Sequence, residues 1–186
     1  ADRVNTVSPT YAKEIQHNEF GYGLDGLLRY RQNRLNGIIN GIDTDIWNPG
    51  TDKHLTQNYN RKTLSKKRAN KTALQKALGL PVSTDIPMIG MVSRLVEQKG
   101  LDMILAALKD LVTMPIQIVI LGSGESIYEK SLVAWATKRP EMLSVTIGYD
   151  ETLSHQIEAA SDLYLMPSIF EPCGLNQLYS LRYGTL

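Results

Sequence analysis

The sequence has one cysteine, no long apolar segment and almost no net charge. The single Cys173 excludes an internal disulfide and a cysteine zinc site, and it fits a reducing compartment. No apolar run approaches the roughly 20 residues that span a bilayer, and nothing at the N-terminus resembles a signal peptide. The formal net charge of +1 argues against a broad nucleic-acid-binding surface. We therefore expect a globular protein that binds neither membranes nor nucleic acid.

Three ligand-binding patterns are also missing. The histidines His17, His54 and His155 are solitary in the sequence, so we assign no metal site. The glycine-rich stretch at residues 21–26 is not followed by the Lys-Ser/Thr of a phosphate-binding P-loop. A dinucleotide fingerprint starting at Gly122 would need glycine where Ile127 stands, so an NAD-dependent oxidoreductase is disfavoured. We expect no cofactor.

From residue 88 onward, short apolar segments alternate with stretches that have helical spacing. The expected strands are 88–92, 116–121, 145–147 and 163–166, and the expected helices have apolar faces at 101–108, 128–135, 153–160 and 175–183. Four such units with short connections predict an α/β fold, a Rossmann-like parallel sheet with helices on both faces. In such sheets ligands bind at the carboxyl ends of the strands.

The chain before this pattern is harder to interpret. Residues 37–43 form a short apolar strand interrupted by a turn signal at Asn40-Gly41. Residues 61–76 are rich in lysine and arginine, with a thin apolar face formed by Leu64, Ala69, Leu74, Ala77 and Leu78. A nucleic-acid patch is one interpretation of this segment, but a helix with a solvated basic face is favoured.

Two charged loops follow expected strands. Arg94 leaves the first strand and Lys99 stands at the start of the next helix, an arrangement that suits a diphosphate; the alternative is an exposed basic loop partly offset by Glu97. The loop before residue 175 carries Glu171, whose carboxylate can accept hydrogen bonds from hydroxyl groups. Backbone N–H groups of Cys173, Gly174 and Leu175 would open the last helix and favour an anion, or Glu171 simply caps that helix.

The residues of these loops resemble those of a known family. Residues 171–185 read EPCGLNQLYSLRYGT, which resembles the signature of bacterial glycogen synthases and plant starch synthases. The segments SRLVEQKGLD, NGID and VSPTYAKEI with GYGLDGLL resemble the same family. Its members are retaining glucosyltransferases of the GT-B fold that use a nucleotide-glucose donor. Related transferases that move other sugars carry a second glutamate eight residues after the first, where this chain has Tyr179.

The resemblance implies roles for particular residues. Arg94 and Lys99 would hold the distal phosphate and stabilise the departing ADP. Glu171 would contact the transferred glucose, and Asn40 would face the donor cleft at the interdomain hinge. Tyr149 would stack on adenine, although taken alone it is a rim residue that packs on its neighbours. Asn176 stands where many bacterial members have threonine, and we expect a modest effect on donor contacts.

The resemblance also implies the organisation and function of the chain. Residues 1–39 would be the tail of an N-terminal acceptor-side domain with the hinge. Residues 40–186 would be a C-terminal nucleotide-sugar-binding domain, incomplete at its C-terminus. The implied activity is transfer of glucose from ADP-glucose to the non-reducing end of an α-1,4-glucan, in a bacterial cytoplasm or, for a plant or alga, a plastid. The alternative is a non-catalytic nucleotide- or glucan-binding module, which we expect of the isolated fragment. The oligomeric state has no signal in the sequence.

Overall fold

The computed structural model describes residues 1–186, which divide into two compact units. Unit 1 consists of Ala1–Ile42 together with Phe170–Leu175, and unit 2 consists of Asp43–Ile169 together with Asn176–Leu186. Each unit is described by itself. None of the helices is both long and apolar enough to cross a membrane. The domain boundary expected between residues 39 and 40 stays a prediction.

Unit 1 is a small parallel pair of strands with short helices between them. β1 (Val4–Val7) pairs with β2 (Leu35–Ile38). The connection contains α1 (Pro9–Glu14), α2 (Asn18–Gly21), α3 (Asp25–Tyr30) and the 3₁₀ turn η1 (Gln32–Arg34). The Ser8 hydroxyl caps α1 by accepting a hydrogen bond from the Tyr11 N–H. The strand expected at residues 37–43 was wrong in extent, because β2 ends at Ile38.

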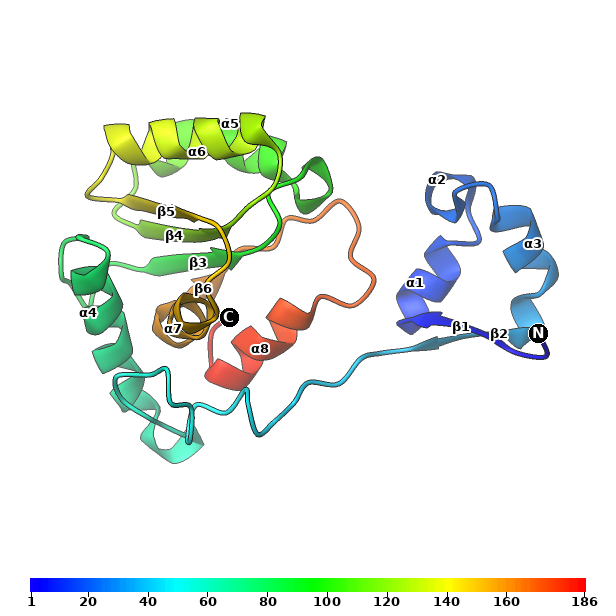
Figure 1. Cartoon of the computed structure of the whole chain (residues 1–186), viewed down its shortest axis with the longest axis horizontal. Helices are drawn as coiled ribbons and strands as arrows, with labels where there is room; N and C mark the ends of the chain where they lie inside the picture. The colour runs from blue at the N-terminus through cyan, green and yellow to red at the C-terminus, as the bar shows by residue number, and fades with distance from the viewer. The chain divides into compact units, whose positions relative to one another are not determined.

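Unit 2 contains the predicted parallel sheet. Its strands β3 (Met88–Val92), β4 (Gln117–Gly122), β5 (Leu143–Ile147) and β6 (Leu163–Tyr164) lie in the order β5-β4-β3-β6. Figure 1 shows α5 (Leu101–Leu111) and α6 (Ser126–Lys138) on one side of the sheet and α7 (Glu151–Ala160) on the other. The fold class predicted from the alternating pattern is therefore confirmed. The last expected strand was too long, since only two residues of it pair in β6.

The central strand shows why the sheet needs cover on both faces. All six residues of β4 are buried. Ile118 and Ile120 belong to the cluster that includes Leu101 and Leu108 of α5, whereas Val119 and Leu121 pack in the cluster of α7. Alternate residues of a strand point to opposite faces. A continuous apolar strand thus supplies two cores at once, as expected for a parallel sheet.

The basic segment before the sheet differs from its expected form. It folds as a 3₁₀ segment, η2 (Arg61–Lys66), followed by α4 (Lys67–Ala77). Of the apolar face expected there, Leu74 is buried but Leu64 is 48% exposed. The inward face of α4 is instead mostly polar, with Asn70, Lys71 and Gln75 all buried. The interpretation as a fully solvated basic face was therefore wrong for Lys71.

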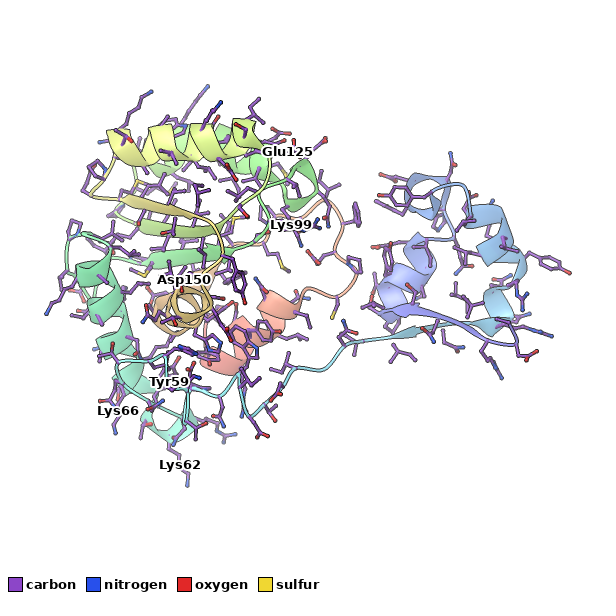
Figure 2. The ribbon with its side chains drawn as sticks, in the orientation of Figure 1. Tyr59, Lys62, Lys66, Lys99, Glu125 and Asp150 are labelled. Carbon is purple, nitrogen blue, oxygen red and sulfur yellow. The ribbon has the colours of Figure 1, made fainter.

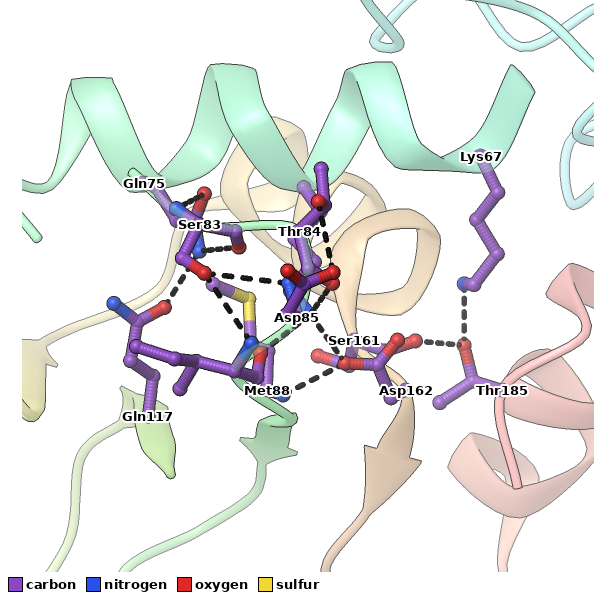
Figure 3. A network of polar contacts seen from close by, with 12 residues as sticks. Lys67, Gln75, Ser83, Thr84, Asp85, Met88, Gln117, Ser161, Asp162 and Thr185 are labelled. Atoms are coloured by element: carbon purple, nitrogen blue, oxygen red, sulfur yellow. Dashed lines mark hydrogen bonds and ion pairs between the residues drawn. The ribbon is translucent and has the colours of Figure 1, made fainter. Parts of the chain in front are cut away.

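Figure 3 shows how part of this buried polar face is satisfied. The Gln75 amide donates to the Ser83 carbonyl and to the Gln117 side chain at 2.7 Å each. Lys71 Nζ donates to the Asp162 carboxylate at 2.7 Å and to the Ile86 carbonyl at 2.6 Å. The same carboxylate accepts the Met88 N–H at the start of β3. Polar contacts thus join α4 to the edge of the sheet where β3 and β6 begin.

Replacement of Lys71 by alanine should destabilise unit 2. The change leaves the Asp162 carboxylate and the Ile86 carbonyl without their cationic donor, which costs about 2–4 kcal/mol of unfolding free energy. Urea unfolding followed by tryptophan fluorescence measures the loss. Lys66→Ala is the matched control, because Lys66 is exposed at the end of η2 (Figure 2) and its removal should change stability by less than about 0.5 kcal/mol. Equal stabilities of the two variants would contradict the assigned role.

Candidate functional site

The strand order places a topological switch point at the carboxyl end of the sheet. The chain passes from β3 to β4 and β5 in one direction and then returns to place β6 on the other side of β3. The loops that leave β3 and β6 therefore diverge at the carboxyl ends of these strands. Such a topological switch point is where open α/β sheets bind ligands. Here the two loops are residues 93–100, with Arg94 and Lys99, and the segment that begins at Leu165.

Backbone contacts hold these two loops against each other. The Ile169 N–H donates to the Gln98 carbonyl at 2.9 Å. Gly100 has φ +73°, and a Cβ at this position would lie 2.1 Å from the Pro167 carbonyl oxygen. A side chain at position 100 would be strained and would also push the loop after β6 away. Glycine is thus required at position 100, where the two loops pack against each other.

The loops after β4 and β5 are attached in the same manner. Leu95 forms a parallel bridge with Gly124, and the Glu125 N–H donates to the Leu95 carbonyl at 2.8 Å. The Gly148 N–H donates to the Gly122 carbonyl at 2.9 Å. The Gly124 N–H itself donates to the Glu129 carboxylate at 2.8 Å. The segment that contains Gly124 therefore forms a tight strand-to-helix turn after β4 that packs on the loop after β3.

Four predicted site residues lie in unit 2. Arg94 is exposed just beyond β3, and its Nη2 donates to the Gln98 side chain at 3.3 Å. Lys99 ends the 3₁₀ turn η3 (Glu97–Lys99), two residues before α5 begins. Figure 2 shows Lys99 and Glu125 at the end of the sheet where the strands finish. Tyr149 is 88% exposed in the loop after β5, where its ring is available to a planar ligand.

Asn176 has a role in positioning that its sequence context does not reveal. It is the second residue of α8 (Leu175–Tyr183), the helix predicted after the Glu171 loop. Its amide donates to the Tyr164 hydroxyl at 2.8 Å and to the Val92 carbonyl. The Tyr164 hydroxyl accepts the Val92 N–H and donates to the Val92 carbonyl. These contacts fix the start of α8 to the carboxyl end of β3.

The other predicted site residues belong to unit 1. Asn40 is exposed beyond the end of β2. Glu171, Cys173 and Gly174 lie in the loop before α8, which begins at Leu175 as predicted. Cys173 forms no disulfide. The predicted site residues are therefore divided between the two units, and their assembly into one site stays a prediction.

A buried glutamate that contacts α8 was not predicted. Glu158 is 1% exposed and accepts the Ser180 hydroxyl of α8 at 2.6 Å. Lys67 Nζ donates to the Glu158 carbonyl at 3.1 Å and to the Thr185 hydroxyl at 2.8 Å (Figure 3). Burial raises the pKa of Glu158 to about 8, although the Ser180 hydrogen bond and the charge of Lys67 oppose the rise. Burial lowers the pKa of Lys67 to about 8, against the charges of Asp162 and Glu158.

Comparison with known proteins identifies two family matches. Residues 73–186 match the family described as Glycosyl transferases group 1, and residues 1–30 match the Starch synthase catalytic domain. Glycogen synthase of Cellvibrio japonicus (strain Ueda107) is 62% identical over 186 residues, which are 100% of this chain and 39% of that protein. Glycogen synthase 1 of Methylococcus capsulatus (strain ATCC 33009 / NCIMB 11132 / Bath) is 56% identical over 100% of this chain and 38% of its own length. The chain thus spans less than half the length of these relatives.

Solved structures have the same fold. The catalytic domain of Starch Synthase IV from Arabidopsis thaliana, bound to ADP and acarbose, matches with a TM-score of 0.94 and 42% identity over 100% of this chain and 38% of that one. Anabaena Alr3699/HepE in complex with UDP and glucose matches with a TM-score of 0.64 over 100% of this chain and 43% of its own. At 18% identity the second likeness concerns the fold alone. The GT-B Rossmann-like fold expected from the sequence is confirmed.

The buried Glu158 predicts a dependence of stability on pH. Its pKa in the folded chain, about 8, lies above the ordinary value of 4.5, so folding favours the protonated form. This contribution is complete below about pH 4.5 and is lost as the pH rises through 8. Below about pH 7 Lys67 is charged in both the folded and the unfolded chain, so it changes the dependence of the unfolding free energy on pH very little.

We therefore expect the chain to lose on the order of 2–4 kcal/mol of stability between pH 5 and pH 8. In Glu158→Gln, which keeps a partner for Ser180, the loss should disappear. Urea unfolding at a series of pH values measures both chains. Glu141→Gln, at an exposed glutamate, should keep the wild-type slope. If the unfolding free energy of Glu158→Gln still falls between pH 5 and pH 8, another group causes the pH dependence.

Proposed function

The chain belongs to the group 1 glycosyl transferases, and from this premise we propose that its protein transfers glucose from ADP-glucose to the non-reducing end of an α-1,4-glucan, with retention. The predicted resemblance to glycogen and starch synthases is confirmed by relatives of up to 62% identity and by the starch synthase structure. The activity itself is proposed for the longer protein, since the chain spans 39% of the first relative.

One observation carries the proposal. The loop with Arg94 and Lys99 leaves β3 at the topological switch point, in a chain that is 42% identical to a starch synthase whose structure holds ADP. Arginine offers a fixed fork of donors to phosphate oxygens and lysine offers a point charge. We assign both cations to the diphosphate of the donor. Preference for ADP over UDP is proposed from the same relative, because the UDP complex is similar in fold alone.

The remaining residues have proposed roles around that diphosphate. The backbone N–H groups of Cys173, Gly174 and Leu175 stand where α8 begins, a position that favours an anion. Tyr149 would stack on adenine, Asn40 would face the donor, and Asn176 would act chiefly through its contacts with Val92 and Tyr164. Glu171 would contact the glucose.

The proposed reaction is a front-face displacement at the anomeric carbon. The bond from that carbon to the distal phosphate oxygen breaks as the bond to the acceptor hydroxyl oxygen forms on the same face. The departing phosphate takes the proton of the acceptor hydroxyl. The protein contributes mainly positioning and stabilisation of the charge that develops on ADP. No cofactor is included in this scheme.

A second candidate is a nucleotide- or glucan-binding module without catalysis. Partners under either candidate are ADP-glucose and an α-1,4-glucan, and under the enzyme proposal the bacterial relatives favour a bacterial cytoplasm. Incorporation of glucose from ADP-glucose into glycogen distinguishes the two candidates, because a binding module incorporates no glucose.

Calorimetric titration of the chain with ADP, UDP and NAD tests the donor assignment. We expect ADP to bind in preference to the other two. Loss of one charge-assisted contact should weaken ADP binding by about 1.5–3 kcal/mol, or roughly 10- to 100-fold, in Arg94→Ala and in Lys99→Ala.

Lys109→Ala is the matched control, because Lys109 is exposed near the far end of the helix that follows the loop. Its ADP affinity should equal that of the unchanged chain. Binding of ADP that is unaffected in both loop variants would refute the assignment of the two cations. Stronger binding of NAD than of ADP would refute the donor class.

A further inference from the structure

One histidine of unit 2 is buried, and only one of its two ring nitrogens forms a hydrogen bond. His155 lies on α7 and is 1% exposed. Its Nδ1 bonds the Asp52 carboxylate at 2.8 Å, whereas its Nε2 is buried with no hydrogen-bond partner. Buried polar atoms in native proteins almost always have a partner. The unsatisfied Nε2 therefore calls for a ligand.

The ring of His155 is held in one orientation. Trp47 stacks on it with a centroid distance of 3.9 Å and an interplanar angle of 9°. Tyr179 stacks on Trp47 at 3.7 Å, so that the indole lies between two rings. The Tyr183 hydroxyl donates to the same Asp52 carboxylate. Asp52 thus accepts hydrogen bonds from the side chains of both His155 and Tyr183.

Two further ligand groups stand beside this ring. His54, Glu151 and His155 each offer a ligand atom, and these three atoms lie within 4.8 Å of one another. Asp52 also positions His54, because Oδ1 of Asp52 accepts the backbone N–H of His54 at 2.8 Å. The Thr152 hydroxyl bonds His54 Nδ1 at 3.0 Å. Glu151 is exposed in the first turn of α7 and can turn its carboxylate toward the two imidazoles.

We propose that His54, Glu151 and His155 form a zinc-class divalent cation site that joins the loop around Asp52 to α7. Two imidazoles and one carboxylate are a ligand set that Zn²⁺ accepts, with water in the fourth position. The bond from His155 Nδ1 to Asp52 is the second-shell contact that orients a metal-binding histidine. In a tetrahedral zinc site neighbouring ligand atoms are about 3.3 Å apart, so the three side chains, of which Glu151 is exposed, would move closer together when the ion binds.

The expectation of no metal rested on the distribution of histidines along the chain. The fold brings together residues that the sequence separates, since Asp52 and His155 are 103 positions apart. Glu151 does stand one helical turn before His155 on α7, a spacing that places both on one face. That pair was the only sequence signal for the site. The inference concerns a part of unit 2 that has no assigned role in glucosyl transfer, and it does not depend on the proposed function.

Calorimetric titration of the chelator-treated chain with Zn²⁺ at pH 7.5 tests the site. We expect one ion per chain, no comparable binding of Mg²⁺, and a rise of roughly 5–10 °C in the unfolding temperature at a hundredfold excess of free zinc over Kd. In His54→Ala and in Glu151→Gln the zinc affinity should fall at least tenfold. These variants change exposed or half-buried side chains, so they should fold without the ion; circular dichroism verifies this.

His17→Ala and Cys173→Ser are the controls, because they remove other zinc-binding side chains and leave the three proposed ligands intact. Both should bind zinc like the unchanged chain. Absorption of the Co²⁺-loaded chain should show a four-coordinate site without a thiolate band. Zinc binding that is lost in either control, retained in both ligand variants, or absent from the unchanged chain would overturn the proposal.

Discussion

The short pairing between β3 and β6 determines where the loops that follow these two strands lie. Only Ile89 with Leu163 and Gly90 with Tyr164 are paired in this ladder. Side chains then extend the connection where the backbone ladder ends. The Tyr164 hydroxyl bonds both the N–H and the C=O of Val92, and the Asn176 amide bonds the same carbonyl. At the other end Asp162 accepts the Met88 N–H. These contacts thereby hold the loops after β3 and β6 next to each other, although β6 has only two residues.

Much of the sheet could be predicted because its signals are local. The apolar spacing of α5 and the largely apolar sequence of β4 predict that these two elements are buried. The helix α8 begins and ends at the predicted residues. The inward face of α4 could not be predicted, because burial of Lys71 depends on Asp162, 91 residues away. For the same reason the site residues could be named while their assembly could not. Each loop shows its chemistry locally, but the contacts that bring loops together are long-range.

The side chain at position 179, where the sequence differs from that expected of related transferases, takes part in aromatic packing. The family resemblance implies a glutamate at this position in many related transferases that move other sugars, and this chain has a tyrosine. The Tyr179 ring stacks on Trp47, which in turn stacks on His155, and Tyr183 meets the edge of the same indole. Aromatic side chains bury large apolar areas, so these stacked rings contribute to the packing around the indole. A carboxylate at this position would remove one side of the stack, so the choice of residue at 179 is linked to packing around Trp47.

Backbone contacts hold the loop after β3 independently of the Arg94 side chain. They are the bridge from Leu95 to Gly124 and the hydrogen bond from Ile169 to Gln98. Arg94 adds a 3.3 Å contact within its own loop. Backbone contacts survive substitution of a neighbouring side chain, so the loop should keep its shape when Arg94 is replaced. Because the loop is already ordered, a diphosphate that binds there need not offset the entropy of ordering it. A weaker affinity in Arg94→Ala can then be attributed to the lost charge rather than to a disordered loop.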